Sequence, residues 1–339
     1  MENRKGIGFV GTLLCDMVKT ISHFPKRGTM GAIKSVERSV GGIVTNTGIN
    51  LAKIAPEIPV YAYGKVGNDE NGRFIADMLK KYNINCDNID FSKTAGTSFT
   101  DVMSEEGSER TFFIYQGANA EFSPDDIDYD GIRCEIMHVG YILLLDIFDR
   151  KDDEYGTVMA RFLHNLQKYG IKTSVDMISN ENGDYVGIAR PAIKYCDYVI
   201  INEVEASHIC EIPAYGENGK LDIAAIEKMA KAIASFGAKD KVIIHAKEAG
   251  FIYNVKTEKF SCLPSLLIPE ELIKGSVGAG DTFAAGCLYG IYNGFEDTDI
   301  LAFASAAAAC NLFSPNAIDG LADRNQVYDV MKKFERRKL

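Results

Sequence analysis

Short apolar runs alternate with amphipathic segments along most of the chain, and this alternation limits the possible folds more than any other feature. Runs that read as buried strands lie at 7–11, 59–64, 135–140, 171–176, 197–202 and 241–245. Between them, apolar residues recur at helical spacing at 74–82, 158–166 and 223–233. This order predicts an α/β fold: a central, mostly parallel sheet with helices on both faces, which binds ligands at the carboxyl ends of its strands.

One segment breaks this rhythm and predicts a second, smaller sheet. Residues 96–119 read as two strands joined by the turn "SEEGSER", with no helix between them. Such a hairpin does not join a parallel sheet easily, so we expect it to pair with residues 17–39 and to project over the strand ends as a lid. No linker or internal repeat interrupts the chain. The expected organisation is one domain, 1–339, with the lid at about 12–40 and 95–119.

Charge and cysteine content restrict the partners and the compartment. The chain has a net charge of −10 at pH 7, and an acidic surface repels nucleic acid and anionic membranes, so neither is an expected partner. No apolar run approaches the length of a membrane span, and Asp16 follows the apolar start at once, which favours a buried strand over a signal peptide. Eight cysteines without a C-x-x-C pair predict a reduced, cytoplasmic protein.

The glycine-rich stretch 6–11, "GIGFVG", matches the pattern G-x-G-x-x-G of dinucleotide-dependent oxidoreductases. That fingerprint needs a strand before it and a helix that opens within it. Only five residues precede Gly6, and the segment that follows has no convincing helical cap. The context therefore disfavours a dinucleotide site, and a Walker A loop is absent from the sequence.

A second glycine-rich stretch, "KGSVGAGDTF" at 274–283, directly precedes a predicted helix. Gly278, Ala279 and Gly280 leave backbone N–H groups open at its N-terminus, where the helix dipole and the unpaired donors favour an anion. Asp281 would repel that anion. Either Asp281 caps the helix, or it is a base that takes a proton from a hydroxyl while the N–H groups stabilise charge on a transferred group. The local pattern leaves both interpretations open.

Two further segments place polar residues at predicted helix starts. In "SVGGIVTN", Gly41 and Gly42 permit close approach of the backbone to a ligand, and Asn46 offers a donor and acceptors that suit sugar hydroxyls. In "NEVE", Asn202 and Glu205 lie three residues apart, so both side chains can face the strand ends, and Glu205 could hold Mg²⁺ through water. A plain helix start and a helix cap are the alternative interpretations.

These elements, in this order, resemble the ribokinase-like (PfkB) family of carbohydrate kinases, and the resemblance spans nearly the whole chain. "GGIVTN" resembles the family's di-glycine and Asn sugar motif, "GSERTFFIYQGAN" its lid strand, "NEVE" its N-x-x-E motif and "GAGDTF" its C-terminal signature. Asp16 stands where a sugar-binding aspartate is expected. The resemblance implies a ribokinase-like fold and an ATP-dependent, Mg²⁺-requiring transfer of a phosphoryl group to a sugar hydroxyl.

The resemblance also implies roles for individual residues. Asp281 would be the base that activates the acceptor, and Gly278, Ala279 and Gly280 would form the anion hole for the γ-phosphoryl group. Asn202 and Glu205 would organise Mg²⁺ and the phosphates, and the sugar would contact Asp16, Gly41, Gly42 and Asn46. Asp146, which ends "YILLLD" at a predicted strand terminus, is a further candidate for a substrate contact.

Four positions bear on the cation and the nucleotide. Gly275 stands where the family normally has an Asp that often helps to bind a monovalent cation, so potassium activation is left open. The loop "HAKEAG", 245–250, replaces the family's T-L-G-x-x-G and keeps only Gly250, with Lys247 as a charge that could compensate near the phosphates. Asn311 is a candidate nucleotide contact in an alanine-rich helix, although helix packing alone explains those alanines.

We therefore expect an ATP-dependent kinase that phosphorylates a primary hydroxyl of a small ribose- or fructose-like carbohydrate. A nucleoside kinase of the same family is one alternative, in which Phe99, Phe113 and Tyr115 of the lid either form a slot for the base or only pack the lid. A non-catalytic sugar-sensing protein on the same fold is another, which the altered loop at 245–250 favours and the intact Asp281 opposes. Lid sheets of this family often pair between two copies, so a homodimer is also expected.

Overall fold

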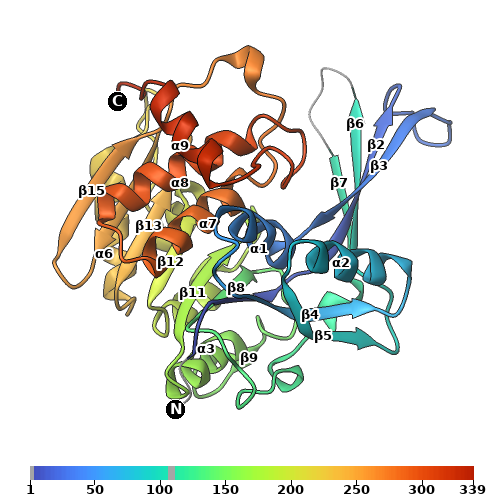
Figure 1. Cartoon of the computed structure of the whole chain (residues 1–339), viewed down its shortest axis with the longest axis horizontal. Helices are drawn as coiled ribbons and strands as arrows, with labels where there is room; N and C mark the ends of the chain where they lie inside the picture. Colours follow the sequence, from blue (N-terminus) through green and yellow to red (C-terminus); the bar gives the residue numbers. More distant parts are fainter. Residues whose placement is uncertain (1–3, 106–110) are drawn as a thin grey trace.

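The computed structural model describes residues 4–105 and 111–339 (Figure 1). A nine-stranded sheet forms its centre, in the order β15-β14-β13-β12-β11-β8-β1-β4-β5. The strands are β1 (Ile7–Gly11), β4 (Val60–Gly67), β5 (Asn85–Ser92), β8 (Ile136–Ile142), β11 (Lys172–Met177), β12 (Tyr198–Asn202), β13 (Lys241–His245), β14 (Ala249–Asn254) and β15 (Lys259–Pro264). The pairs from β5 to β13 are parallel, whereas the pairs β13–β14 and β14–β15 at one edge are antiparallel. The predicted parallel sheet is confirmed.

Helices cover both faces of this sheet because successive side chains of each buried strand point to opposite faces. In β12, Ile200 packs into one hydrophobic cluster, whereas Val199 and Ile201 pack into the other. The first cluster lies under α1 (Ile43–Ile54), α2 (Glu70–Lys81), α7 (Ala279–Tyr292), α8 (Asp297–Asn311) and α9 (Arg324–Lys333). The second lies under α3 (Val158–Lys168), α4 (Arg190–Ile193), α5 (Glu203–Cys210) and α6 (Ile223–Ser235).

Local signals set the ends of the predicted helices as expected. Asp222 caps α6 by accepting hydrogen bonds from the amides of Ala224 and Ala225. Gly170 and Gly237 follow α3 and α6 with φ values of 76° and 120°, which favour glycine. Among the described residues, no helix is long and apolar enough to cross a membrane.

A separate four-stranded sheet, which we call the small sheet, has the order β3-β2-β6-β7. Its strands are β2 (Leu14–Ile21), β3 (Ile33–Gly41), β6 (Phe99–Glu105) and β7 (Thr111–Tyr115). The pairs β2–β3 and β6–β7 are antiparallel, whereas β2 and β6 run parallel. Figure 1 shows this sheet projecting from the rest of the fold. The turn predicted between β6 and β7 includes residues 106–110, which lie outside the described residues.

The stretch "GIGFVG" is the first strand itself and not a nucleotide loop. Gly6 immediately precedes β1, and Ile7 to Gly11 form the strand between β4 and β8. The chain then enters β2 of the small sheet, with no helix after the glycines. The strand–loop–helix geometry that the dinucleotide fingerprint requires is therefore missing, and that interpretation of 6–11 is wrong.

Candidate active site

Asp281 lies in the first turn of α7 but does not cap it. The N-cap is Gly278, so Asp281 is the third helical residue, and no side chain caps this helix. Gly278 has a φ of 75°, and a Cβ built there would lie 2.4 Å from Cβ of Ala317, so the helix start requires glycine. The cap interpretation of Asp281 is thus wrong, and its carboxylate needs another explanation.

Asp281 is 8% exposed, and its carboxylate accepts hydrogen bonds from three side chains. Nδ2 of Asn46 donates to Oδ2 at 3.0 Å. Thr47 Oγ1, at 3.3 Å, and the Tyr141 hydroxyl, at 2.5 Å, both donate to Oδ1. Burial raises the pKa of Asp281, and the hydrogen bonds from Tyr141, Asn46 and Thr47 oppose that rise. These donors favour the ionised form of a buried carboxylate.

Helix α1 brings two of these donors to α7. Gly42, with a φ of 89°, is its N-cap, and a Cβ there would lie 2.4 Å from the carbonyl oxygen of Thr12. One helical turn after Asn46, the side chain of Asn50 donates to Thr282 at 2.9 Å and to the Ala317 carbonyl at 3.0 Å, which fixes α1 against α7. Asn46, which the sequence predicts to bind sugar, therefore donates a hydrogen bond from Nδ2 to Asp281. Its Oδ1 is buried without a hydrogen-bond partner.

The first turn of α7 also carries the predicted anion hole. The amide of Ala279 donates to the Ser276 carbonyl at 3.2 Å. Backbone amides of a first helical turn have no partner within the helix, so those of Gly278 and Gly280 remain candidates for an anion. Gly275, three residues before Gly278, has no room for a side chain, because its Cβ would lie 2.9 Å from Cα of Pro315.

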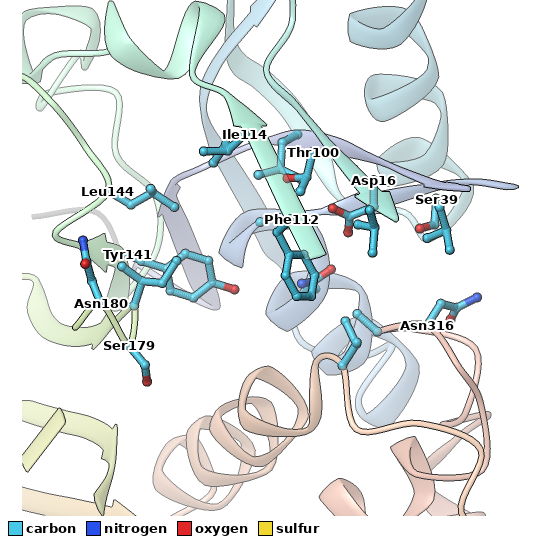
Figure 2. Close-up of a pocket in the computed structure, with 18 of the residues that line it drawn as sticks. Asp16, Ser39, Thr100, Phe112, Ile114, Tyr141, Leu144, Ser179, Asn180 and Asn316 are labelled. Carbon is cyan, nitrogen blue, oxygen red and sulfur yellow. The ribbon is translucent and has the colours of Figure 1, made fainter. Parts of the chain in front are cut away.

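A pocket of about 610 Å³ opens beside these groups, between the small sheet and the main sheet (Figure 2). Asp16, Gly42 and Asn46 line it, as expected for substrate contacts, and so does Tyr141, which the sequence did not indicate. Asp146 is exposed, lies four residues beyond the end of β8 and does not line this pocket. Tyr141 and Asn46 connect the pocket wall directly to the buried Asp281.

One wall of the pocket is apolar and comes largely from the small sheet. Phe112 and Ile114 of β7 line the pocket opposite Leu144, and Figure 2 shows Phe112 projecting into its centre. The aromatic residues that the sequence suggested for a base slot lie elsewhere. Phe99 and Tyr115 pack on each other with ring centroids 5.3 Å apart, and neither they nor the exposed Phe113 line the pocket.

Asn202 and Glu205 form a capping box at the start of α5. The Asn202 side chain accepts from the Glu205 amide at 2.9 Å, and Oε2 of Glu205 accepts from the Asn202 amide at 2.9 Å. Oε1 of Glu205 accepts from Asn202 Nδ2 at 2.7 Å and from Ser179 at 2.8 Å. The cap interpretation is therefore right, and the cap also orients the carboxylate of Glu205, a residue that is 2% exposed at the strand ends.

Buried carboxyl groups gather here. Burial raises the pKa of Glu205 to about 7. Asp176, at the end of β11, has a pKa well above its usual value because of burial and then of the charges on Glu205 and Asp281. Among the residues described, no group of three or more His, Cys, Asp or Glu side chains is placed to hold a metal ion directly. Glu205 keeps one open lone pair on Oε2, which fits Mg²⁺ held through water.

The nucleotide side differs from the sequence-based expectation. Lys247 is exposed. Gly250 pairs with His245 in the antiparallel ladder and is buried, and its Cβ would lie 3.0 Å from Leu301. Asn311 is fully buried, and its Nδ2 donates to the Val277 carbonyl at 2.7 Å. Gly250 and Asn311 thus have packing roles that account for their positions.

His245, which the sequence did not indicate, is the member of this loop that reaches α7. Its Cε1 would lie 3.4 Å from a Cβ built at Gly280, and its ring packs on Phe283 with centroids 4.9 Å apart. Burial lowers the pKa of His245 to about 4. A neutral imidazole therefore lies beside the amides of the predicted anion hole.

The family model that matches this chain and two of its relatives are named for carbohydrate kinases. A model of the pfkB family of carbohydrate kinases matches residues 7–324. The 5-dehydro-2-deoxygluconokinase of Geobacillus thermodenitrificans is 24% identical, with 98% of this chain and 96% of that protein aligned. The ribokinase of Arabidopsis thaliana is also 24% identical, over 95% of this chain and 80% of that protein.

Solved structures agree on the fold. The structure of Arabidopsis thaliana ribokinase complexed with ribose and ATP superposes with a TM-score of 0.79 at 21% identity, over 97% of this chain and 99% of that one. Ribokinase from Thermotoga maritima gives a TM-score of 0.77 at 19% identity, over 97% and 100% of the two chains. The ribokinase-like fold expected from the sequence is confirmed.

Proposed function

The chain belongs to the pfkB family of carbohydrate kinases, and we propose that it transfers the γ-phosphoryl group of ATP to a hydroxyl of a small ribose- or fructose-like carbohydrate. One observation carries this proposal. A buried carboxylate, Asp281, stands at the N-terminus of α7 beside a pocket of about 610 Å³, and three hydrogen-bond donors favour its ionised form. A base and an anion site in contact are what a phosphoryl transfer to a hydroxyl requires.

In the proposed reaction, the acceptor hydroxyl gives its proton to Asp281. As that proton leaves, the acceptor oxygen bonds to the γ-phosphorus, and the bond from the γ-phosphorus to the bridging oxygen of ADP breaks. The amides of Gly278 and Gly280 face the developing negative charge at the positive end of the α7 dipole. Mg²⁺, oriented through water by Glu205 and its cap partner Asn202, would neutralise phosphate charge when bound.

The polar end of the pocket supports a sugar as acceptor. Asp16, Ser39 and Thr100 from the small sheet line it together with Asn46, and Figure 2 shows the first three on one side of the pocket. A carboxylate, two hydroxyls and an amide offer both donors and acceptors to the hydroxyl groups of a carbohydrate. Two relatives named for sugar kinases, a 5-dehydro-2-deoxygluconokinase and a ribokinase, support the same class.

A nucleoside is the second candidate acceptor, because the pocket also has apolar lining from Phe112, Ile114 and Leu144. An aromatic ring in such a lining suits a planar base. Both proposals use Asp281 as the base and differ only in the acceptor, so turnover on a single panel of sugars and nucleosides distinguishes between them.

The decisive experiment measures ADP release from ATP and Mg²⁺ with pentoses, ketohexoses, 2-deoxygluconate derivatives and nucleosides. Asp281→Asn should lower kcat on the preferred acceptor by about 10²–10⁴-fold, the usual contribution of a general base. Asp153→Asn, at an exposed aspartate, is the matched control and should not change turnover. Equal turnover in Asp281→Asn and wild type would remove Asp281 as the base. An acceptor that raises the melting temperature of both proteins without any turnover would favour a sugar sensor.

Two further expectations belong to this proposal. The eight cysteines, all within the described ranges, are free thiols, which supports a reducing compartment such as the cytoplasm. Strand β7 ends the small sheet, and its side chains are exposed along the whole strand. Pairing of the small sheet with that of a second copy would cover strand β7, so a homodimer remains our expectation.

A further inference from the structure

Tyr141 connects the acceptor pocket to the base. It lies near the end of β8, and its ring lines the pocket, where Figure 2 shows the hydroxyl pointing inward. That hydroxyl donates to Oδ1 of Asp281 at 2.5 Å. An O–H···O⁻ distance in this range is typical of a hydrogen bond strengthened by the charge of the acceptor.

The donors around Asp281 are distributed unevenly over its two oxygens. A carboxylate has about four lone-pair positions, two on each oxygen. Tyr141 and Thr47 take both positions on Oδ1, whereas Asn46 takes one on Oδ2. One lone pair of Oδ2 is therefore left for a further donor, and the acceptor hydroxyl is the donor that a phosphoryl transfer would bring.

We propose that Tyr141 is a positioning residue for the phosphoryl transfer: its hydroxyl saturates Oδ1 of Asp281 and turns the open lone pair of Oδ2 toward the acceptor hydroxyl. This inference rests on the proposed kinase function. The acceptor proton moves to Oδ2, the acceptor oxygen bonds to the γ-phosphorus, and ADP leaves with the electrons of the broken P–O bond. Tyr141 keeps its own proton throughout and touches the reaction only through Asp281.

Burial and the charged groups around Asp281 keep the Tyr141 hydroxyl protonated, so it remains a hydrogen-bond donor. The pKa of Tyr141 lies well above its usual value because of burial and of the charges on Asp281 and Asp176, so the phenol stays protonated. Asp176, from β11, also faces the pair, and its charge repels a phenolate. Glu205 from α5 acts on Asp176, and the imidazole of His245 from β13 lies beside Gly280.

The test replaces the hydroxyl and keeps the ring, in Tyr141→Phe. Loss of one hydrogen bond to a charged group should raise the pKa of Asp281, so the acid limb of kcat/KM against pH should move up by about one to two pH units. On the plateau above this limb, kcat should fall by about 10–100-fold because the base is misplaced, with a smaller change in the acceptor KM. A second readout needs no turnover: the ¹³C carboxyl resonance of Asp281, assigned with Asp281→Asn, should titrate at higher pH in Tyr141→Phe.

Tyr63→Phe is the matched control, because Tyr63 is 2% exposed and its hydroxyl has no hydrogen-bond partner. It should leave the pH profile and the Asp281 resonance unchanged. An Asp281 titration in Tyr141→Phe that coincides with wild type would overturn the role of Tyr141, whether or not an acceptor has been found. Wild-type protein without turnover on any acceptor would instead count against the kinase proposal, and the resonance would still decide the role of Tyr141.

Discussion

Gly41 lies directly against the carboxylate of Asp16: a Cβ built at Gly41 would be 2.5 Å from Oδ2 of Asp16. The two residues belong to neighbouring strands of the small sheet, where Asp16 in β2 pairs with Ser39 and Leu14 pairs with Gly41. The sequence suggested that Gly41 permits close approach of the backbone to a ligand. In the structure Gly41 makes room for Asp16, and Asp16 lines the pocket.

Gly41→Ala should therefore weaken acceptor binding through Asp16. The new methyl group would overlap Oδ2 of Asp16 and also lie 2.6 Å from Leu14, so the carboxylate must move. Loss of a hydrogen bond to a charged group corresponds to about a 10–100-fold rise in the acceptor KM, with a smaller change in kcat. Steady-state kinetics beside Asp16→Asn would check this. Gly48→Ala, whose Cβ would lie 3.4 Å from Phe9, is the control, and an unchanged KM in Gly41→Ala would refute the argument.

Glu205→Gln should change the magnesium requirement. Glutamine can keep part of the cap with Asn202, but it removes the charge that would orient hydrated Mg²⁺. Outer-sphere partners of metals commonly contribute 10–100-fold in affinity, so the Mg²⁺ concentration for half-maximal activity should rise by about tenfold or more. Glu203→Gln, on the same helical turn and hydrogen-bonded to Tyr215 at 2.9 Å, is the matched control. Equal Mg²⁺ dependence in the two variants would exclude the assignment to Glu205.

Asp149 should make the protein less stable as pH rises. One of its oxygens accepts from the Leu145 amide at 3.1 Å, and the other is buried without a hydrogen-bond partner. Burial raises the pKa of Asp149 from 3.8 to about 7. Between these values the folded state holds a proton that the unfolded state has lost, so the free energy of unfolding falls as pH rises from about 4 to about 7. At about 1.4 kcal/mol per pKa unit, the upper limit is about 4 kcal/mol.

Urea unfolding of Asp149→Asn at pH 4.5 and pH 8 would measure this effect. At each pH, the free energy of unfolding of the variant is compared with that of wild type. This difference should shift in favour of the variant between pH 4.5 and pH 8, because asparagine cannot ionise. The exposed Asp153→Asn should show no such difference between the two pH values. A constant difference between Asp149→Asn and wild type across this range would show that Asp149 does not titrate as a buried group.

The central strands were predictable because they are buried on both faces. Five of the six predicted runs form strands whose two sides face different hydrophobic clusters, which leaves a nearly continuous apolar signal, and the sixth, β11, contributes Val175 and Met177 to the second cluster. The edges of the sheet lack this signal. Strand β5, "NCDNIDFS", is half-exposed and mostly polar, and β15 is partly exposed at the opposite edge. The sequence therefore predicted the centre of the sheet and missed both of its edges.

The surroundings of Asp281 were predictable only where one short segment carries them. Asp281 and the glycines before it lie within four residues, so their geometry follows from a helix start. The contact between Tyr141 and Asp281 joins residues 140 positions apart, and that between Thr47 and Asp281 joins residues 234 apart. Only the packing of α1 and β8 around α7 brings these donors together, and no local pattern in the sequence indicates it.

Substitutions of two neighbouring phenylalanines in β7 should distinguish the two proposed roles of the small sheet, which are to line the acceptor pocket and to form the homodimer contact. Phe112 lines the pocket, whereas Phe113, on the opposite face of the same strand, does not, although both are more than half exposed. Phe112→Ala should raise the acceptor KM by about tenfold, since an aromatic wall contributes apolar contact area to the acceptor. Phe113→Ala should leave the KM unchanged and weaken self-association, measured by sedimentation velocity. If Phe113→Ala raises the KM as much as Phe112→Ala, then the small sheet acts on the pocket through its overall stability and not through the Phe112 ring.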